Sequence, residues 1–381
     1  MQSFNLYLPT KVYFGTNKWR NALLTEQQLL QKPVMVVTTG RSLYRLGYLP
    51  KVLEEICKIR QGHAAVVYDN ISANPKLSEI KAGIQIARDN AIEVVIGFGG
   101  GSAMDAAKAV AAGIGLEQPI ESLLFDGLLP SEKTPPIIAI PTTAGTGSEL
   151  SKGAIISSPE RGVKTGIRGE HIYPKVAIVD PIFTYQVPVN ITMETGFDVI
   201  AHAFESYISH KATYFSKGIS EQVLQIAGKA LQDLAKDIKD HSARERISYA
   251  SMIAGINLGN VGTALPHRMQ YPIGAQTDTS HAAGLMALYP SWIRHEYSYA
   301  KELVEQGIFL LTGHVCHTCG EVEEAFHRFI KALGVRRNLC ELGIQAEQAS
   351  ELAKQVTGNI ANDPVAIEVG IMEKIYSEAM D

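Results

Sequence analysis

The first half of the chain alternates between short apolar runs and helical patterns. Five runs rich in β-branched residues are bounded by Gly, Pro or Thr, as buried strands are: PVMVVTT, GHAAVVYD, IEVVIGFGG, PPIIAIPTT and KVAIVDP. Helical patterns such as LSEIKAGIQIARDNA and SAMDAAKAVAAGIG lie between several of them. Buried strands alternating with helices predict a parallel sheet covered on both faces. The N-terminal segment MQSFNLYLPTKVYFG is expected to form a first strand rather than a signal peptide.

The second half has a different pattern. From Thr192 onward there is almost no strand signal, and amphipathic helical patterns follow one another: METGFDVIAHAFESYIS, KGISEQVLQIAGKALQDLAKDI, RERISYASMIAGINLG, EVEEAFHRFIKALG and AEQASELAKQVTG. The segment PIFTYQVPVN combines two prolines with no helical period, which indicates a boundary there. We therefore predict an α/β domain over residues 1–185 and an all-helical domain over residues 186–381. The uncharged stretch 247–266 predicts a buried helix followed by a loop, because polar residues occur throughout it.

Composition narrows the classes of protein. A length of 381 residues suggests two domains. There are 35 Lys and Arg and 39 Asp and Glu, so the net charge is −4, and no basic block exists for a nucleic-acid backbone. Four cysteines in such a chain do not make a disulfide framework. We expect a cytoplasmic protein that binds neither nucleic acid nor membrane.

One glycine-rich segment indicates a nucleotide site. IEVVIGFGGGSAMDAAKAVA predicts a strand, a turn with Gly99, Gly100 and Gly101, and a helix that opens at Ser102. Such a turn lets the backbone approach a pyrophosphate at the helix N-terminus. Because no third glycine follows inside the helix, a tight turn that binds nothing is the alternative. The second loop at residues 139–149, AIPTTAGTGSE, favours binding, since ligands of open α/β sheets lie at the carboxyl edge.

The segment after VMVVTT bears on the choice of cofactor. A carboxylate at this place usually binds a ribose 2′-hydroxyl. Here Thr39, Gly40, Arg41 and Ser42 lie at the strand end, and the first carboxylate is Glu54. An arginine with hydroxyl groups suits a 2′-phosphate, which favours NADPH over NADH. The alternative is a solvated turn whose arginine points to water.

Histidines and a carboxylate suggest a metal site in the second half. Asp198 and His202 are four residues apart and share one face of an apolar helix. Taken alone, this pair fits a structural Asp–His hydrogen bond better than a ligand pair. His267 and His281 bracket a later segment with prolines and glycine. Three imidazoles and one carboxylate suit Fe²⁺, Zn²⁺ or Co²⁺.

Together these motifs resemble the iron-containing, group III alcohol dehydrogenase family. GFGGGSAMDAAKA, IPTTAGTGSE, AIVDP, GFDVIAHAFESY and the frame HRMQYPIGA…SHAAGLMALYP occur in the family's order over essentially the whole chain. The resemblance implies a Rossmann-like α/β domain, an all-helical metal-binding domain as in dehydroquinate synthase, and an active site in the cleft between them. It places Fe²⁺, with Zn²⁺ as the alternative, on Asp198, His202, His267 and His281. The nucleotide contacts that it implies are Asn74, Gly100, Gly101, Ser102, Asp105, Thr142, Thr143, Thr146 and Lys164, to which we add Ser148 of the same loop.

Two residues depart from the family's pattern. Many members carry a further histidine where this chain has Tyr271, which becomes the candidate for the proton path. Arg268 is unexpected next to His267, and it would either bind an acidic group of the substrate or form a structural salt bridge.

We expect a metal-dependent, NAD(P)(H)-dependent alcohol dehydrogenase or aldehyde reductase. Its substrate would be a small primary alcohol or aldehyde, with an acidic group if Arg268 binds one, and the metal would polarise the carbonyl group. One alternative is a lyase or cyclase of the dehydroquinate synthase type, whose basic substrate clamp has no counterpart here beyond Arg268. Another is a non-catalytic nucleotide-binding module held together by the metal. A homodimer is expected. The single CxxC of Cys316 and Cys319 is weak evidence for a second metal site.

Overall fold

The computed structural model describes residues 3–277, 279–335, 337–358, 360–365 and 368–380. It forms two compact units, one from Tyr7 to Val187 and one that contains residues 3–6 together with the chain from Pro188 onward. The division lies two residues after the predicted boundary of residues 185 and 186. Residues 3–6 were expected in the α/β domain but belong to the helical unit, where the Phe4 ring stacks on Phe215 with centroids 5.9 Å apart.

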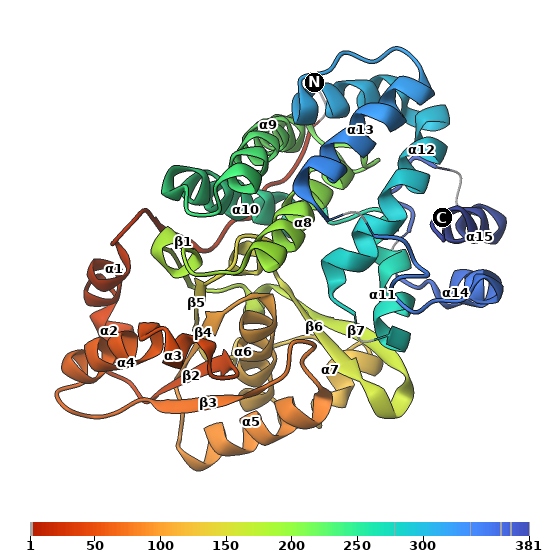
Figure 1. The fold of residues 1–381 in the computed structure, drawn as a ribbon. Helices are drawn as coiled ribbons and strands as arrows, with labels where there is room; N and C mark the ends of the chain where they lie inside the picture. Colours follow the sequence, from red (N-terminus) through yellow and green to blue (C-terminus); the bar gives the residue numbers. More distant parts are fainter. Residues whose placement is uncertain (1–2, 278, 336, 359, 366–367, 381) are drawn as a thin grey trace. The chain divides into compact units, whose positions relative to one another are not determined.

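A six-stranded sheet forms the centre of the first unit (Figure 1). Its strands are β1 (Lys11–Phe14), β2 (Val34–Thr39), β3 (Val66–Ile71), β4 (Val94–Gly99), β5 (Ile137–Pro141) and β8 (Val176–Val179). Their spatial order is β1-β8-β5-β4-β2-β3, and every neighbouring pair is parallel. The five apolar runs and the N-terminal segment each supply one strand, so the predicted parallel sheet is confirmed.

Helices cover both faces because side chains alternate along each strand. In β2, Val34 and Val36 pack into one core with α1 to α4, whereas Met35 and Val37 pack into a second core with α5 to α7. The helices of this unit are α1 (Trp19–Thr25), α2 (Gln27–Leu30), α3 (Ser42–Arg45), α4 (Tyr48–Ile59), α5 (Leu77–Asp89), α6 (Gly101–Ile114) and α7 (Glu121–Phe125).

An antiparallel hairpin, β6 (Gly153–Ser158) and β7 (Val163–Arg168), was not predicted. Only alternate residues such as Ala154, Ile156 and Ile167 enter the core, so the segment lacks the continuous apolar run of the buried strands. Short 3₁₀ helices complete the structure: η1 (Ser148–Leu150), η2 (Pro159–Arg161), η3 (Glu170–Ile172), η4 (Pro181–Thr184) and, in the second unit, η5 (Ala346–Gln348).

The second unit is helical among its described residues, as predicted. Helix α8 is buried along most of its length and packs against α9, α10 and α12 (Figure 1). Helix α11 was not predicted. The helices are α8 (Val189–Ile208), α9 (Tyr214–Lys236), α10 (His241–Asn260), α11 (Leu265–Thr277), α12 (His281–Thr312), α13 (Cys319–Leu333), α14 (Ala349–Gln355) and α15 (Val369–Glu378).

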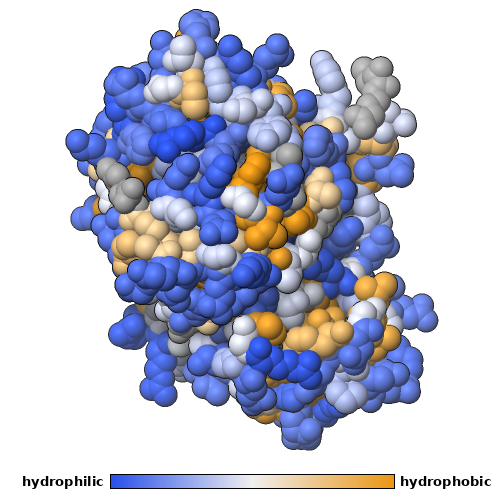
Figure 2. Space-filling view, turned by 90° about the vertical axis from the view of Figure 1, so that its right-hand side faces the viewer, coloured by the Kyte–Doolittle hydropathy of each residue, from blue (hydrophilic) through white to orange (hydrophobic). Residues whose placement is uncertain are grey.

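The surface is polar over most of the face in Figure 2, with smaller apolar areas between the polar side chains. Large exposed apolar residues occur at separate places, among them Leu129, Tyr214 and Val315. No helix in the described part of the chain is long and apolar enough to cross a membrane.

Candidate functional site

The topology creates a ligand position at the carboxyl edge of the sheet. From β2 the chain continues outward to β3, whereas from neighbouring β4 it continues in the opposite direction to β5. Ligands of open α/β sheets bind where the strand order reverses in this way. The segment 39–42 follows β2 and the glycine turn 99–101 follows β4, so both predicted nucleotide segments flank this point.

The glycines of the turn allow another loop to approach closely. Helix α6 begins at Gly101, one residue before the predicted Ser102. A Cβ placed at Gly101 would lie 2.5 Å from Cγ2 of Thr146, and one at Gly99 would lie 2.6 Å from Cβ of Ala103. A side chain at either position would therefore force the segments apart. The N-terminus of a helix such as α6 is a position at which backbone N–H groups bind anions.

The loop after β5 lies against this turn. The backbone N–H of Thr142 donates to the carbonyl of Gly99 at 2.9 Å. A Cβ placed at Gly100 would lie 3.2 Å from Oγ1 of Thr143. The structure thus brings together the threonine loop and the glycine turn that the sequence predicted separately.

A third segment joins them from the loop after β3. The hydroxyl of Ser102 contacts the carbonyl oxygen of Ala73. Nζ of Lys164 donates to Oδ1 of Asn74 at 2.9 Å, so two of the expected nucleotide contacts lie side by side. Their direct contact with a nucleotide stays a prediction.

A buried network supports the threonine loop from behind. Lys108 is fully buried, and its Nζ donates to the carbonyl of Ser148 at 2.6 Å, to its hydroxyl at 2.8 Å and to the carbonyl of Gly153 at 2.9 Å. The carboxylate of Asp105 accepts from the Ser148 hydroxyl at 2.6 Å and from the Ile155 N–H at 2.9 Å. Both oxygens of Asp105 are thus engaged with the protein. This arrangement gives Asp105 and Ser148, which we expected to contact the nucleotide, a role in holding the loop.

Burial shifts the pKa values of this network toward the neutral forms. It lowers the pKa of Lys108 to about 8, against the opposing effect of Asp105 and Glu149. It also raises the pKa of Glu149 to about 7, although Lys108 opposes this. The network therefore combines one ammonium group and two carboxyl groups in a place that water does not reach.

The four predicted metal ligands converge in the second unit. Oδ1 of Asp198, on α8, lies 3.5 Å from Nε2 of His267 and 3.8 Å from Nε2 of both His202 and His281. Ligands at 2.0–2.1 Å around a tetrahedral ion lie about 3.3 Å apart, so these distances fit a first-row metal with little adjustment. Ligand atoms of Asp198, His267 and His281 all lie within 4.8 Å of one another.

The lack of hydrogen-bond partners for two atoms of this cluster, among the described residues, also fits a bound cation. Oδ1 of Asp198 and Nε2 of His267 are buried and have no hydrogen-bond partner among the described residues. Burial opposes ionisation of Asp198, but the surrounding imidazoles outweigh it and hold the pKa of Asp198 below its usual range. At 3.8 Å, Asp198 and His202 are too far apart for the structural hydrogen bond that we considered.

Glu205 orients one ligand. Its Oε1 lies 2.7 Å from Nδ1 of His267 and also accepts from the Tyr289 hydroxyl at 3.2 Å, while Oε2 accepts from the N–H of Ala264 at 2.7 Å. Because a carboxylate only accepts, Nδ1 carries a proton, and Nε2, which lies near Asp198, is the nitrogen that would bind a metal. Burial lowers the pKa of His267, but Glu205 and Asp198 outweigh it and raise the pKa to about 10.

Gln270 plays the same part for the second ligand, since its Oε1 accepts from Nδ1 of His281. The start of α11 is fixed by Asp363, whose Oδ2 accepts from the N–H of Leu265 at 2.8 Å. We did not predict Glu205 or Gln270. Each follows a ligand histidine by three residues and so shares its helical face, which is a signal that could have found them.

Comparison with known proteins agrees with this geometry. Residues 9–181 match the sequence model described as iron-containing alcohol dehydrogenase, and residues 192–380 match that of the family's C-terminal domain. The chain belongs to the iron-containing alcohol dehydrogenase family. NADH-dependent butanol dehydrogenase A of Clostridium acetobutylicum is 30% identical over 373 residues, or 94% of each chain. These matches support an oxidoreductase of the alcohol dehydrogenase type.

Solved structures of the iron-containing alcohol dehydrogenases have the same fold. NADH-dependent butanol dehydrogenase A of Thermotoga maritima is 25% identical with a TM-score of 0.90, and it covers 100% of this chain and 99% of its own. Sulfoacetaldehyde reductase of Bifidobacterium kashiwanohense, solved with NAD⁺, is 27% identical with a TM-score of 0.88 and the same coverage. The fold class predicted for this family is confirmed.

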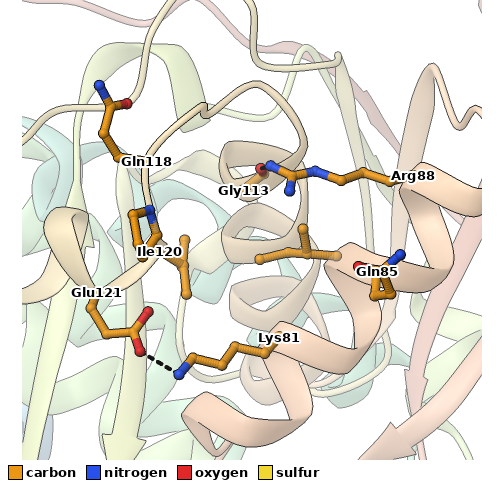
Figure 3. Close-up of a pocket in the computed structure, with 9 residues that line it drawn as sticks. Lys81, Gln85, Arg88, Gly113, Gln118, Ile120 and Glu121 are labelled. Atoms are coloured by element: carbon orange, nitrogen blue, oxygen red, sulfur yellow. Dashed lines mark hydrogen bonds and ion pairs between the residues drawn. The ribbon is translucent and has the colours of Figure 1, made fainter.

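Two other features of this iron-containing alcohol dehydrogenase family member are structural. Thr318, between Cys316 and Cys319, caps α13 together with Glu321, and the described residues place no metal-binding cluster at these cysteines. A surface hollow of about 270 Å³ lies between α5 and the segment before α7 (Figure 3). Its charged groups are paired, as Lys81 is with Glu121. It includes Gly113, at the opposite end of α6 from the glycine turn, roughly 20 Å away.

Proposed function

We propose that the protein interconverts small aldehydes and primary alcohols with a nicotinamide nucleotide and one Fe²⁺ ion. The observation that carries the proposal is the convergence of three imidazole nitrogens on one oxygen of Asp198. The glycine turn at the start of α6, in the other unit, supports a nucleotide cofactor.

Asp198, His202, His267 and His281 would hold the metal. When bound, the metal would supply Lewis-acid polarisation of the substrate oxygen, and the nicotinamide would exchange a hydride with the substrate carbon. Asp198 contributes the negative charge of the ligand set. Glu205 and Gln270 fix the imidazoles of His267 and His281, so little reorganisation is needed on binding. Imidazoles with one carboxylate also suit Zn²⁺, and the family description favours iron.

Tyr271 is our candidate for the proton step. Its ring centroid lies 6.3 Å from that of His281, and its hydroxyl accepts from Arg268 at 3.3 Å. A hydroxyl that accepts from a cation can donate its own proton toward a developing alkoxide. Tyr271→Phe is expected to lower kcat while leaving bound metal unchanged.

We propose NADPH rather than NADH for one local reason. The segment after β2 has no carboxylate for a 2′-hydroxyl, and it carries the exposed Arg41 instead. The Clostridium and Thermotoga relatives are NADH-dependent by name. Arg41→Ala is therefore expected to weaken catalysis with NADPH more than with NADH, and equal losses would contradict the NADPH preference.

Absorbance assays test the whole proposal. Oxidation of NADPH and NADH is followed with neutral and acidic aldehydes on Fe²⁺- and Zn²⁺-reconstituted protein. Net oxidation that depends on the aldehyde and the metal is expected. A cyclase would return its cofactor each cycle, and a non-catalytic module would show no turnover, so absence of oxidation in every combination would contradict the proposal.

The cytoplasmic location and the homodimer stay predictions.

A further inference from the structure

Arg268 is a buried cation that forms no ion pair with the described residues. The residue is 9% exposed. One guanidinium nitrogen donates to Oγ1 of Thr263 at 3.2 Å and the other to the hydroxyl of Tyr271 at 3.3 Å, while the group lies 5.5 Å from the centre of the Tyr271 ring. Nε has no hydrogen-bond partner, and no ion pair joins Arg268 to a carboxylate in the described part of the chain. The structural salt bridge considered from the sequence is therefore not found among those residues.

Burial of a guanidinium group costs free energy unless other groups compensate for its charge. A buried charge needs an opposite charge and hydrogen bonds, and neutral hydroxyls supply only part of this. The buried Arg244 shows the structural alternative, because its Nε donates to the carbonyl of Ile238 at 3.3 Å and another of its nitrogens donates to Thr192 at 2.7 Å. In Arg268 the corresponding Nε is buried and has no acceptor among the described residues.

The Nε edge of Arg268 is buried beside a backbone position that has no side chain. Gly358 faces it with φ of +96°, a conformation that side chains rarely adopt. A Cβ placed there would lie 3.6 Å from Nε and 3.7 Å from one of the terminal guanidinium nitrogens. Any larger residue would thus cover the free edge of the guanidinium group.

Arg268 also lies near the proposed metal ligands. It directly follows His267 in α11, and its partner Tyr271 is the residue whose ring lies 6.3 Å from His281. The His267 and His281 rings are themselves 5.0 Å apart. A short molecule whose carbonyl oxygen lies at the ligands could therefore place its other end at the guanidinium group.

We propose that Arg268 binds the acidic group of the substrate, which makes the protein a reductase of short aldehydes that carry a carboxylate, sulfonate or phosphonate. This inference rests on the proposed function. The planar fork of a guanidinium group matches two oxygens of any of these anions, and Nε is the donor that has no acceptor among the described residues. The anion neutralises the buried charge, and its position fixes the aldehyde end at the metal ligands.

Steady-state kinetics of the metal-loaded protein test the substrate class. The anionic substrates are succinic semialdehyde, sulfoacetaldehyde and phosphonoacetaldehyde, and butanal and propanal are the neutral ones. We expect kcat/KM to be higher for at least one anionic aldehyde by about 10-fold or more, and the ranking of the three identifies the acidic group.

Variants assign the effect to Arg268. In Arg268→Met, kcat/KM for the preferred anionic aldehyde should fall about 100-fold further than for the neutral aldehydes, chiefly through KM. Arg268→Lys should lie in between, because an ammonium group keeps the charge but loses the fork. Arg328→Met, which removes an exposed arginine of α13, is the matched control and should behave as wild type.

Calorimetry separates this inference from the proposed function. Ethanesulfonate, propionate and ethylphosphonate are titrated into the metal-loaded protein and into Arg268→Lys, after circular dichroism has shown that the variant is folded. Saturable binding of one anion that weakens at least 10-fold in the variant supports the inference even if no aldehyde is turned over. Equal turnover of neutral and anionic aldehydes by the wild type, equal losses for both in Arg268→Met, or anion binding that the variant retains would each overturn it.

Discussion

Two buried polar clusters, one in each unit, are built in opposite ways. In the α/β unit, the ammonium group of Lys108 donates to four protein acceptors, so the cluster is closed. In the helical unit, Oδ1 of Asp198, Nε2 of His267 and Nε of Arg268 have no hydrogen-bond partner among the described residues, so the cluster is open. Buried polar groups are costly without partners. This difference is what we expect if the closed cluster positions a loop and the open one binds the proposed metal and substrate.

Removal of a proposed metal-binding histidine from the open cluster should have the largest effect on activity. His267→Ala is expected to lower kcat/KM by at least about 1000-fold, because Lewis-acid catalysis contributes several kcal/mol to the rate. Bound metal, measured by elemental analysis, should fall with it, while the circular dichroism spectrum stays that of the wild type. His63→Ala removes an exposed histidine of the other unit and should change neither property. Wild-type metal content in His267→Ala would contradict the assignment.

Removal of the cation from the closed cluster should affect stability instead. Lys108→Met leaves the Asp105 carboxylate and the Ser148 carbonyl buried with fewer partners, so the free energy of unfolding should fall by about 3–5 kcal/mol. Urea denaturation measures this change. Arg268→Met, which removes a cation with no carboxylate partner among the described residues, should change the same quantity by about 1 kcal/mol or less. Equal destabilisation by the two variants would remove the distinction between the clusters.

Weakening the hydrogen bond that orients His267 in the open cluster should have a moderate effect on metal affinity. In Glu205→Gln, an amide replaces the carboxylate that accepts from His267 and from Ala264, so the imidazole is held less firmly. Metal affinity, measured by competition with a chelator, should fall about 10- to 100-fold. The matched control is Glu321→Gln, because Glu321 also accepts from backbone N–H groups but caps α13. If Glu205→Gln keeps wild-type affinity, Glu205 does not position His267.

The smallest expected effect concerns two buried carboxyl groups, Glu296 and Asp363. Burial, and next the neighbouring Asp363, raise the pKa of Glu296. The folded state therefore retains a proton that the unfolded state loses above about pH 4.3, and the free energy of unfolding falls as the pH rises. Glu296→Gln removes this titration.

The stability difference between Glu296→Gln and the wild type should thus shift in favour of the variant by at least about 1 kcal/mol from pH 5 to pH 8. Urea denaturation at both pH values measures it. A difference that is independent of pH would show that Glu296 titrates normally in the folded protein.

The sheet and the ligand histidines could be predicted because their signals are local. Strands buried on both faces are continuous apolar runs, and His267 and His281 are ligand-type residues in a segment whose other charged residues are only Arg268 and Asp278. The hairpin β6–β7 was missed because its buried residues are separated by half-buried or exposed ones.

Helix α11 could not be predicted because its start depends on distant residues. It contains Pro272, which argues against a helix, and its first N–H groups are bound by Glu205 and Asp363 from other parts of the chain. The partners of Arg268 could not be predicted either, because they depend on how the chain folds around this side chain.

Titration of Co²⁺ into the metal-free protein tests the central claim most directly, because the visible spectrum of Co²⁺ reports its ligands without any turnover. The account predicts one saturable ion per chain in the wild type and loss of that site in Asp198→Asn and His267→Ala. Absence of saturable binding in the wild type, or the same spectrum and stoichiometry in the two variants, would contradict it.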